Sequence, residues 1–284
     1  MTHAAATPLD TVIHRGDGTM IGAFRCPPSH RNFRDTGPIE NDIFVFPRTS
    51  VRIRHAGGPA FVADQTTATI YNCGQIYDRG MVSEEGDRSD WFAVPRWVAI
   101  EAVLVNGLEP GLRGPFSFAS TAISNRMYLA QRQVFRRALA GVSARETDEG
   151  IYALLDDLVT SVASRHHQTN RVDSESLEMA AEIRALISSH PEEDWPLSRL
   201  AGALGVSEFR LCRAFRKATG GTIHRHLLDV RLRASLESLE RPRTDLTTLA
   251  FDLGFSSHSH FSAAFVRSFN QTPSTCRTML AARS

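Results

Sequence analysis

Four cations, Arg210, Arg213, Arg216 and Lys217, follow closely after Phe209, and these five residues are the best suited to recognition chemistry. An arginine such as Arg213 can present two parallel N–H groups to guanine O6 and N7, which discriminates between bases by about 1–3 kcal/mol. Phe209 can meet a thymine methyl group. Arg216 and Lys217 suit phosphates, which hold position and make binding salt-sensitive. The segment predicts contact with a nucleic acid, and a solvated cationic face is the alternative.

These cations belong to the first of two copies of one phrase, which occupy residues 197–220 and 246–269. Eight positions of the first copy recur 49 or 50 residues later in the second copy, and all of them are apolar residues, glycine or serine. They are Leu197, Leu200, Ala201, Leu204, Gly205, Ser207, Leu211 and Phe215. Seven are identical in the second copy, and Leu211 is replaced by Phe261. The spacing predicts a short helix, a glycine that ends it, and a second helix capped by the serine. This is a helix-turn-helix, whose second helix lies in the DNA major groove.

A single copy would be weak evidence, because similar corners occur in helical proteins that never bind nucleic acid. Here two copies are joined by a segment from His224 to Glu240 that is itself predicted to be helical. If that helix is rigid, the two second helices can enter successive major grooves, about 34 Å apart. The pair of copies therefore favours a double-stranded DNA partner.

The second copy offers fewer cations, so we expect it to discriminate between sequences more weakly. Its second helix carries polar side chains, and Arg267 lies near its end. His258 and His260 are two residues apart on that helix, and residues at this spacing do not face each other. A metal site is therefore not predicted there.

At this point the chain resembles the AraC/XylS family of bacterial transcriptional regulators, over roughly residues 180 to 280. The residues that carry the resemblance are Leu200-Ala201, Gly205-Val206-Ser207, Leu211, Arg213, Phe215, Gly220, Leu227, Arg231, Ser235, Ala250, Gly254-Phe255, Ser257, Phe261, Phe265, Thr272-Pro273-Ser274 and Arg277. The chain departs from the family at Asn270 (usually Gly), Cys276 (usually aromatic), His226 (often aromatic) and Ala263 (commonly Arg). The last departure removes one expected DNA contact.

The resemblance implies a sequence-specific regulator that binds promoter DNA, works with RNA polymerase as an activator, and forms a homodimer. It makes Phe209, Cys212 and Arg213 the residues that reach base edges. The full set of expected DNA-binding residues is Ser207, Phe209, Arg210, Cys212, Arg213, Arg216, Lys217, Ser257, His258, Ser259, Ser262 and Arg267.

Residues 10 to about 118 read as short β-rich runs separated by Gly, Pro, Asn and Asp. Four such runs are Asp42–Pro47, Ser50–His55, Ala60–Ala63 and Ala68–Tyr71. Closely spaced short strands predict a small barrel or sandwich. The family resemblance makes this a cupin-like barrel that binds a small-molecule effector. The segment Asp87–Asp90 is predicted to be a turn with a local ion pair.

Two amphipathic helices are predicted next, at 125–139 and 146–165, and the first has a basic outer face that includes Arg126 and Arg132. They pack on the barrel or form a dimer interface, and we favour packing with some share in dimerisation. A polar stretch, 166–176, is the expected linker. The predicted fold class is therefore α+β, with a sensor and dimerisation domain at 1–165 and an all-α DNA-binding domain at 177–284.

Charge agrees with this division of the chain. From Trp195 onward there are 13 Lys and Arg against 6 Asp and Glu, a net charge of +7, whereas residues 1–194 carry 19 against 25, or −6. A basic end on an acidic remainder indicates a nucleic-acid partner at that end. With no membrane-length apolar run and no signal-like N-terminus, a soluble cytoplasmic protein without a membrane partner is expected.

Residues of the N-terminal part leave several alternatives open. Tyr71, Tyr77, Trp91 and Trp97 either line an effector pocket or belong to the core. A cupin-type metalloenzyme would need a ligand set, yet the available Cys26, His30, His55 and Cys73 lack the expected spacing. A thiol redox sensor would use Cys26 or Cys73. No CxxC pair is present, so we predict no disulfide framework, no metal, no cofactor and no catalytic residue.

Overall fold

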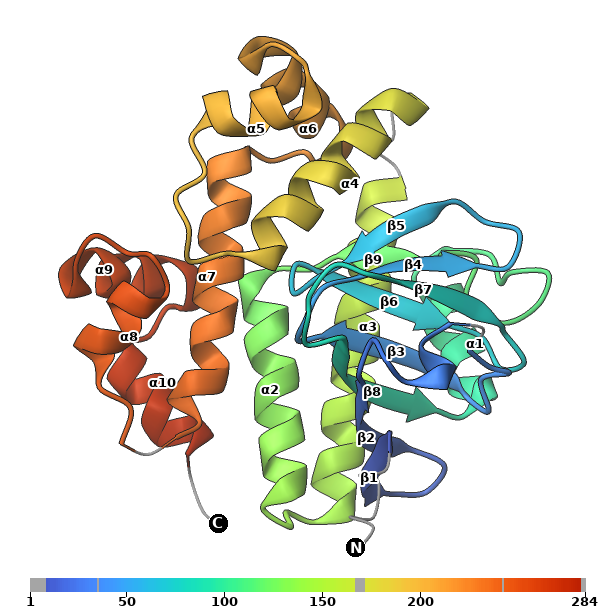
Figure 1. Ribbon diagram of the computed structural model, residues 1–284. Helices are drawn as coiled ribbons and strands as arrows, with labels where there is room; N and C mark the ends of the chain where they lie inside the picture. Colours follow the sequence, from blue (N-terminus) through green and yellow to red (C-terminus); the bar gives the residue numbers. More distant parts are fainter. Residues whose placement is uncertain (1–8, 35, 167–171, 242, 282–284) are drawn as a thin grey trace, which may run out of the picture.

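A computed structural model describes residues 9–34, 36–166, 172–241 and 243–281 of the chain, and it divides into a strand-rich part and a helical part (Figure 1). The strands are β1 (Asp10–Arg15), β2 (Met20–Cys26), β3 (Asp42–Pro47), β4 (Val51–His55), β5 (Ala60–Ala63), β6 (Thr67–Tyr71), β7 (Tyr77–Met81), β8 (Asp87–Val94) and β9 (Ser120–Ala122). The helices are α1 (Arg96–Val105), α2 (Asn125–Leu139), α3 (Ala144–His166), α4 (Ser174–Ser189), α5 (Leu197–Leu204), α6 (Glu208–Thr219), α7 (Ile223–Leu239), α8 (Leu246–Asp252), α9 (His258–Phe269) and α10 (Pro273–Leu280).

The strands form two antiparallel sheets, with strand orders β1-β2-β8-β3-β6-β9 and β5-β4-β7. Alternate residues of the larger sheet enter different cores: Val45 and Trp91 pack with residues of the smaller sheet, whereas Phe44 and Phe92 pack with α2 and α3. Burial of both faces explains why these strands lack a clean apolar–polar alternation. The α+β prediction is confirmed, and the strands in the described ranges form the sandwich of the two predicted alternatives, not one closed barrel.

The predicted turn at Asp87–Asp90 is wrong, because these residues begin β8 and pair with both β2 and β3. Their carboxylates are not paired locally. Asp87 accepts a hydrogen bond from Arg79 of β7, and Asp90 accepts one from Arg132 of α2. Distant partners that neutralise both carboxylates allow an acidic segment to occupy the middle of a sheet.

The predicted helices lie where the sequence pattern put them, with small shifts at their ends. Helix α2 has the predicted bounds, and α3 is slightly longer than 146–165. Residues 167–171 of the expected linker lie outside the described residues. Its last three residues form the first turn of α4, because the Asp173 side chain accepts a hydrogen bond from Ser176 N and caps that helix.

Both helix-turn-helix units have the expected turn chemistry. Gly205 ends α5 in the left-handed region, with φ of 64°, and Gly254 takes the same region at 75° after α8. Ser207 caps α6 by accepting from Arg210 N, and Ser257 caps α9 by accepting from His260 N. The repeated pattern therefore predicted these two units correctly.

The departures from the resembled family are accommodated locally. Asn270 ends α9 in the left-handed region, which asparagine tolerates better than most residues. Cys276 of α10 is fully buried among apolar side chains. The ring of His226 packs against Phe215, with centroids 5.7 Å apart, in the manner of an aromatic residue.

Helix α7 belongs to two hydrophobic cores. At its start, Ile223 and Leu227 pack with α4, α5 and α6, which form the first unit with α7. Further along, Leu232, Leu236 and Leu239 join a core that includes α2, α3, the larger sheet and α8–α10. The second unit therefore shares its core with the N-terminal part of the chain, whereas the first unit has one of its own.

Arg231 of α7 connects the turn of the second unit with the segment that leads into the first unit. Its guanidinium donates to the carbonyl of Gly254 at 2.7 Å in the second unit. It also donates to three carbonyls before α5: Pro191 at 2.6 Å, Glu192 at 3.4 Å and Glu193 at 2.8 Å. Four carbonyls fixed by one side chain restrict the relative orientation of the units.

Gly254→Ala tests this clamp, with Gly205→Ala as the matched control. Each substitution puts a side chain in the left-handed region, which costs about 1–2 kcal/mol of unfolding free energy. At Gly205 a Cβ meets nothing within 4 Å, but at Gly254 it comes within 2.7 Å of the Arg231 guanidinium and closer still to the Glu192 carbonyl. We expect Gly254→Ala to lose about 1–3 kcal/mol more in urea unfolding. Equal losses would contradict the clamp.

Candidate nucleic-acid interface

One stripe of α6 faces solvent opposite its buried side. Leu211, Ala214 and Phe215 are buried. Phe209, Arg213 and Arg216, spaced by four and three residues, lie on the opposite side and are exposed. Phe209 is 77% exposed, which is unusual for an aromatic side chain in a folded protein. Arg213 and Arg216 have no hydrogen-bond or ion-pair partner among the described residues, so this stripe is available to a ligand.

The other two cations of α6 are already paired with acidic residues at the beginning of α4. Arg210 forms an ion pair with Glu175, and the Lys217 ammonium lies 2.5 Å from the Asp173 carboxylate. The hydrogen bond from Lys217 holds the pKa of Asp173 well below its usual range. Arg210 and Lys217 are exposed, as expected, but a phosphate would have to displace a carboxylate to reach them.

Two further expected residues of the first unit are also accessible. Cys212 is exposed and lies beside the stripe of Phe209, Arg213 and Arg216. Ser207 is exposed, and its hydroxyl oxygen accepts a hydrogen bond from Arg210 N at 3.3 Å. All seven expected residues of the first unit therefore lie on or beside the outer side of α6.

The second unit presents a smaller and less basic surface. His258, Ser259 and Arg267 of α9 are exposed, whereas Ser257 and Ser262 are half-buried. Ala263 is exposed on the outer side, so the departure from arginine leaves no cation there. The His258 ring lies 3.3 Å from the Ser262 hydroxyl and the His260 ring 3.1 Å from the Ser256 hydroxyl, so the imidazoles have separate partners.

Helix α7 sets the separation of the two units, which lie toward different ends of it (Figure 1). Its 17 residues correspond to about 25 Å of helix at 1.5 Å per residue. Successive major grooves on one face of a duplex are about 34 Å apart. Because both units pack on this one helix, their separation is fixed by the fold.

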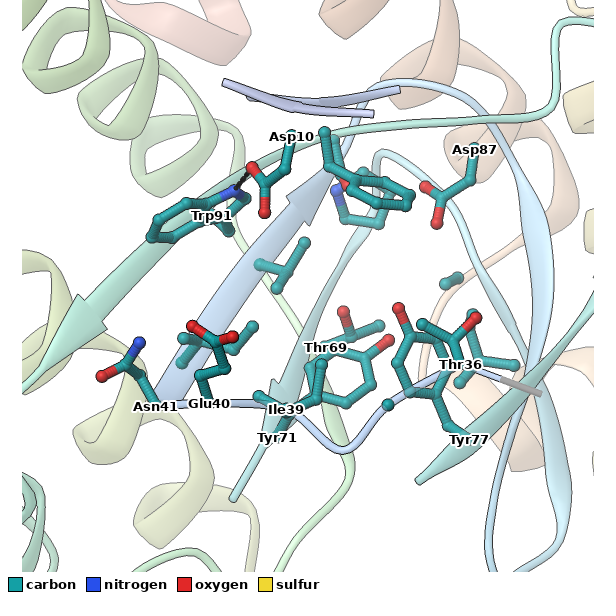
Figure 2. A pocket seen from close by; sticks show the side chains of 18 of the residues that line it. Asp10, Thr36, Ile39, Glu40, Asn41, Thr69, Tyr71, Tyr77, Asp87 and Trp91 are labelled. Carbon is teal, nitrogen blue, oxygen red and sulfur yellow. Dashed lines mark hydrogen bonds between the residues drawn. The ribbon is translucent and has the colours of Figure 1, made fainter. Parts of the chain in front are cut away.

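The predicted aromatic residues Tyr71, Tyr77 and Trp91 surround one cavity of about 380 Å³ between the two sheets (Figure 2). The tyrosine rings are 4.7 Å apart between centroids, and the Trp91 indole N–H donates to Asp10 at 2.6 Å. Trp97, expected with them, is instead 66% exposed on α1 and does not line this cavity. Trp97 lies on the solvent-facing side of α1, so it cannot reach the cavity between the sheets.

A buried ion pair completes the wall of this cavity, and the sequence pattern did not indicate it. The Arg79 guanidinium donates to Asp87 at 2.5 Å and to the hydroxyls of Thr36 at 2.7 Å and of Tyr77. Burial raises the pKa of Asp87, and Arg79 only partly offsets it. Arg79 and Asp87 lie eight positions apart, on a strand of the smaller sheet and a strand of the larger sheet. Their ion pair therefore becomes visible only when the two sheets are packed together.

The thiols and histidines of this region do not form a reactive or metal-binding group. Cys26 is fully buried, and burial raises the pKa of its thiol, which makes the nucleophilic thiolate less available. Cys73 is exposed, with its sulfur 3.2 Å from the Glu40 carbonyl. Within the described ranges, neither cysteine joins His30 or His55 in a cluster of three potential metal ligands. The metalloenzyme and redox alternatives therefore gain no support.

A second buried cation connects the wall of this cavity with the second unit. Arg132 of α2 is 1% exposed, so its predicted place on a basic outer face is wrong. Its guanidinium donates to Asp90, the neighbour of Trp91 on β8, and to Glu240 at the end of α7, with one bond of 2.8 Å. Burial opposes its charge, yet Asp90 and Glu240 raise the pKa of Arg132. Two carboxylates from different parts of the chain account for its burial.

The match to a protein-family model lies in the helical part of the chain. Residues 200–279 match the family model described as a helix-turn-helix domain. The activator RhaS of Pectobacterium atrosepticum is 29% identical over 144 residues, which cover 49% of this chain and 51% of that protein. The Msm operon regulatory protein of Streptococcus mutans is 28% identical over 127 residues, or 45% of each. The chain thus spans about half the length of these relatives.

Two solved structures are also similar to the chain. ToxT from Vibrio cholerae aligns with 93% of this chain and 99% of its own, at 14% identity and a TM-score of 0.37. A transcriptional regulator with an AraC-type DNA-binding domain from Chromobacterium violaceum aligns with 39% of this chain and all of its own, at 27% identity and a TM-score of 0.36. None of the helices in the described ranges is both long and apolar enough to cross a membrane.

Arg132→Leu tests the buried connection, with Arg126→Leu on the exposed side of the same helix as its control. Removal of Arg132 leaves the Glu240 carboxylate without its cation and leaves Asp90 only the longer ion pair to Arg48, at 3.7 Å. We expect this to cost about 3–5 kcal/mol of unfolding free energy. Arg126→Leu should change it by less than about 0.5 kcal/mol. Chemical unfolding followed by circular dichroism measures the unfolding free energy of both variants. If both lose less than about 0.5 kcal/mol, Arg132 does not stabilise the connection between the sheet and α7.

Proposed function

Because residues 200–279 match a helix-turn-helix domain, we propose that the chain is a sequence-specific transcriptional regulator of the AraC type that binds promoter DNA. The observation that carries this proposal is the pair of serine-capped second helices, α6 and α9, each with an exposed outer side and both fixed to α7. The excess of cations in the C-terminal third supports the same partner.

In this proposal the first unit provides most of the specificity. Phe209, Cys212 and Arg213 contact base edges, and Arg216 contacts a phosphate. Arg210 and Lys217 become phosphate contacts once the backbone replaces their carboxylate partners on α4. The N-cap Ser207 lies at the end of α6 that approaches the DNA, because the N-terminal residues of a recognition helix contact the bases.

The second unit contributes a weaker interaction in the neighbouring groove. His258, Ser259 and Ser262 offer short polar side chains, and Ser257 offers the cap of α9. Arg267 supplies the exposed cation near the end of α9. With alanine at 263, we expect this unit to tolerate more base sequences than the first.

The cavity between the sheets is the proposed effector site. Its volume of about 380 Å³ and its walls of aromatic rings with a few polar groups suit a small molecule held near Tyr71, Tyr77 and Trp91. An effector acts by binding one of two conformations more tightly. Strand β8 offers a physical route, because Trp91 faces the cavity while its neighbour Asp90 is held by Arg132 and so by α7.

Further parts of the proposal follow from the family resemblance. The regulator works in the cytoplasm as a homodimer and activates transcription through RNA polymerase, without catalysis. Residues 1–165 form the sensor and dimerisation domain, 166–176 the linker and 177–284 the DNA-binding domain. The shared core of α2, α3 and α7–α10 implies that the sensor and DNA-binding domains move together on the side of the second unit.

Selection from a random duplex library with the purified full chain tests the DNA-binding proposal. We expect enriched sequences to share two conserved blocks separated by about one helical turn, 10–10.5 base pairs centre to centre. The block read by the first unit should be the better defined of the two. A library that shows no enrichment over its starting composition would reject the proposed function.

Arg213→Ala and Arg216→Ala separate base contacts from phosphate contacts on the selected site. Arg213→Ala should cost about 1–3 kcal/mol of binding free energy and relax the preference at one base position. Arg216→Ala should weaken binding to all sequences alike and reduce the salt slope by about one. Fluorescence anisotropy titrations at several salt concentrations measure both. If Arg213→Ala leaves affinity and base preference intact, its proposed role is wrong.

A further inference from the structure

A second cavity, of about 410 Å³, lies between the N-terminal part of the chain and the first unit, and we propose that it binds a hydrophilic anion. Strands β6 and β9 and helix α3 provide one wall, and α4, the end of α6 and the beginning of α7 provide the other. The effector cavity between the sheets shares no residue with it. It is therefore a separate site.

Four arginines line this cavity, and they exceed the acidic residues near it. They are Arg165, Arg184, Arg225 and Arg233. Arg184 is paired with Asp64 at 2.8 Å, and Arg225 with Asp229 at 3.0 Å. No carboxylate among the described residues pairs with Arg165 or Arg233. Asp64 and Asp229 interact with Arg233 only at longer range. The four arginines thus exceed these two carboxylates by two positive charges.

Arg233 is fixed by neutral oxygens alone. Its guanidinium donates to the Asn125 side chain at 2.5 Å and to the carbonyls of Gln65 at 2.5 Å and Ile123 at 2.9 Å. It is 2% exposed, and burial lowers its pKa to about 10. A buried charge held by neutral dipoles is stabilised further when an anion enters the adjacent space.

The first turn of α7 adds to the positive character of the cavity. The 17-residue helix begins at Ile223, and the Thr222 and Arg225 side chains before and within its first turn line the cavity. Helix N-termini favour anions, because their amide groups and the helix dipole point toward the ligand. His226, in the same wall, is 9% exposed. Its Nε2 atom has no hydrogen-bond partner among the described residues, and the Asp64 carboxylate lies 3.8 Å from it. An acidic or hydroxyl group of a ligand would satisfy it.

The lining of this cavity favours an anionic group. Hydroxyl side chains from both parts of the chain line it together with the arginines: Thr66, Thr67, Ser120, Thr121, Thr219 and Thr222. The cavity between the sheets is lined by several aromatic rings and by fewer arginines. Phosphate or carboxylate groups on a small polar molecule match the guanidinium groups. The ligand class is therefore a phosphorylated or polycarboxylate metabolite.

Isothermal titration calorimetry of the full chain tests this site with two probes, inorganic phosphate and citrate, at constant ionic strength set with chloride. The two arms distinguish phosphate from carboxylate recognition. We expect saturable binding of at least one probe, weakened about tenfold or more in Arg165→Gln. Arg145→Gln is the control, because Arg145 lies on the same helix with its side chain 89% exposed and outside the cavity.

Arg165 has no hydrogen-bond or ion-pair partner among the described residues, so its replacement should leave the fold intact, and near-ultraviolet circular dichroism checks this. The proposal is overturned if neither anion gives saturable heat beyond the chloride reference, or if Arg165→Gln and Arg145→Gln bind alike. Binding to DNA is measured separately. If the chain binds the anion but selects no DNA sequence, the anion site stands and the proposed function is rejected. If the chain selects a DNA sequence but binds neither anion, the proposed function stands and the anion site is rejected.

Discussion

The arrangement of the whole chain depends on one buried cation, Arg132, which lies between the carboxylates of Asp90 and Glu240. Moving a guanidinium out of water is costly, and its attraction to carboxylates compensates only when the geometry is good. Both carboxylates must therefore stay in place: one in the middle of β8, the other at the end of α7. This requirement joins the sheet to the helix that carries both helix-turn-helix units, and apolar side chains of α2, α7 and α9 fill the space around it.

The two units are attached to the N-terminal part in different ways. The second unit shares a continuous core with α2 and α3, and Arg136 of α2 also donates to the Leu280 carbonyl at 3.0 Å. The first unit has its own core and reaches the strands through the exposed ion pair of Arg52 with Glu182 at 2.9 Å and the more buried pair of Arg184 with Asp64 at 2.8 Å. Exposed ion pairs contribute little. The first unit, which carries most of the cations of the proposed DNA surface, therefore depends on polar contacts with the strands, whereas the second unit depends on a shared apolar core.

The sequence predicted local features well and long-range polar ones poorly. Glycines after an apolar stripe and serines before the next predicted both units, because these residues act through neighbouring backbone groups. For Tyr71 and Tyr77 the sequence left two alternatives open, a pocket lining or the core, and the structure places both side chains, buried, at the wall of a cavity. Arg132 and Asp90 were misplaced, since an arginine on an amphipathic helix and an aspartate among polar residues both look solvent-facing until the fold brings them together. The sequence identified Arg231 only as a residue that carries the family resemblance, because its four carbonyl partners come from two segments far apart in the chain.

The carboxylates of Asp173 and Glu175 occupy two cations of α6 in the way that a nucleic-acid backbone would. If DNA takes their place, each new contact is an exchange of one anion for another, so fewer mobile ions leave the complex than the number of cations on α6 suggests. The released acids then lie close to the duplex and repel it. This competition lowers the affinity for non-specific DNA. Phe209 and Arg213 have no such acidic partner among the described residues, so they contribute most to the choice of the binding sequence.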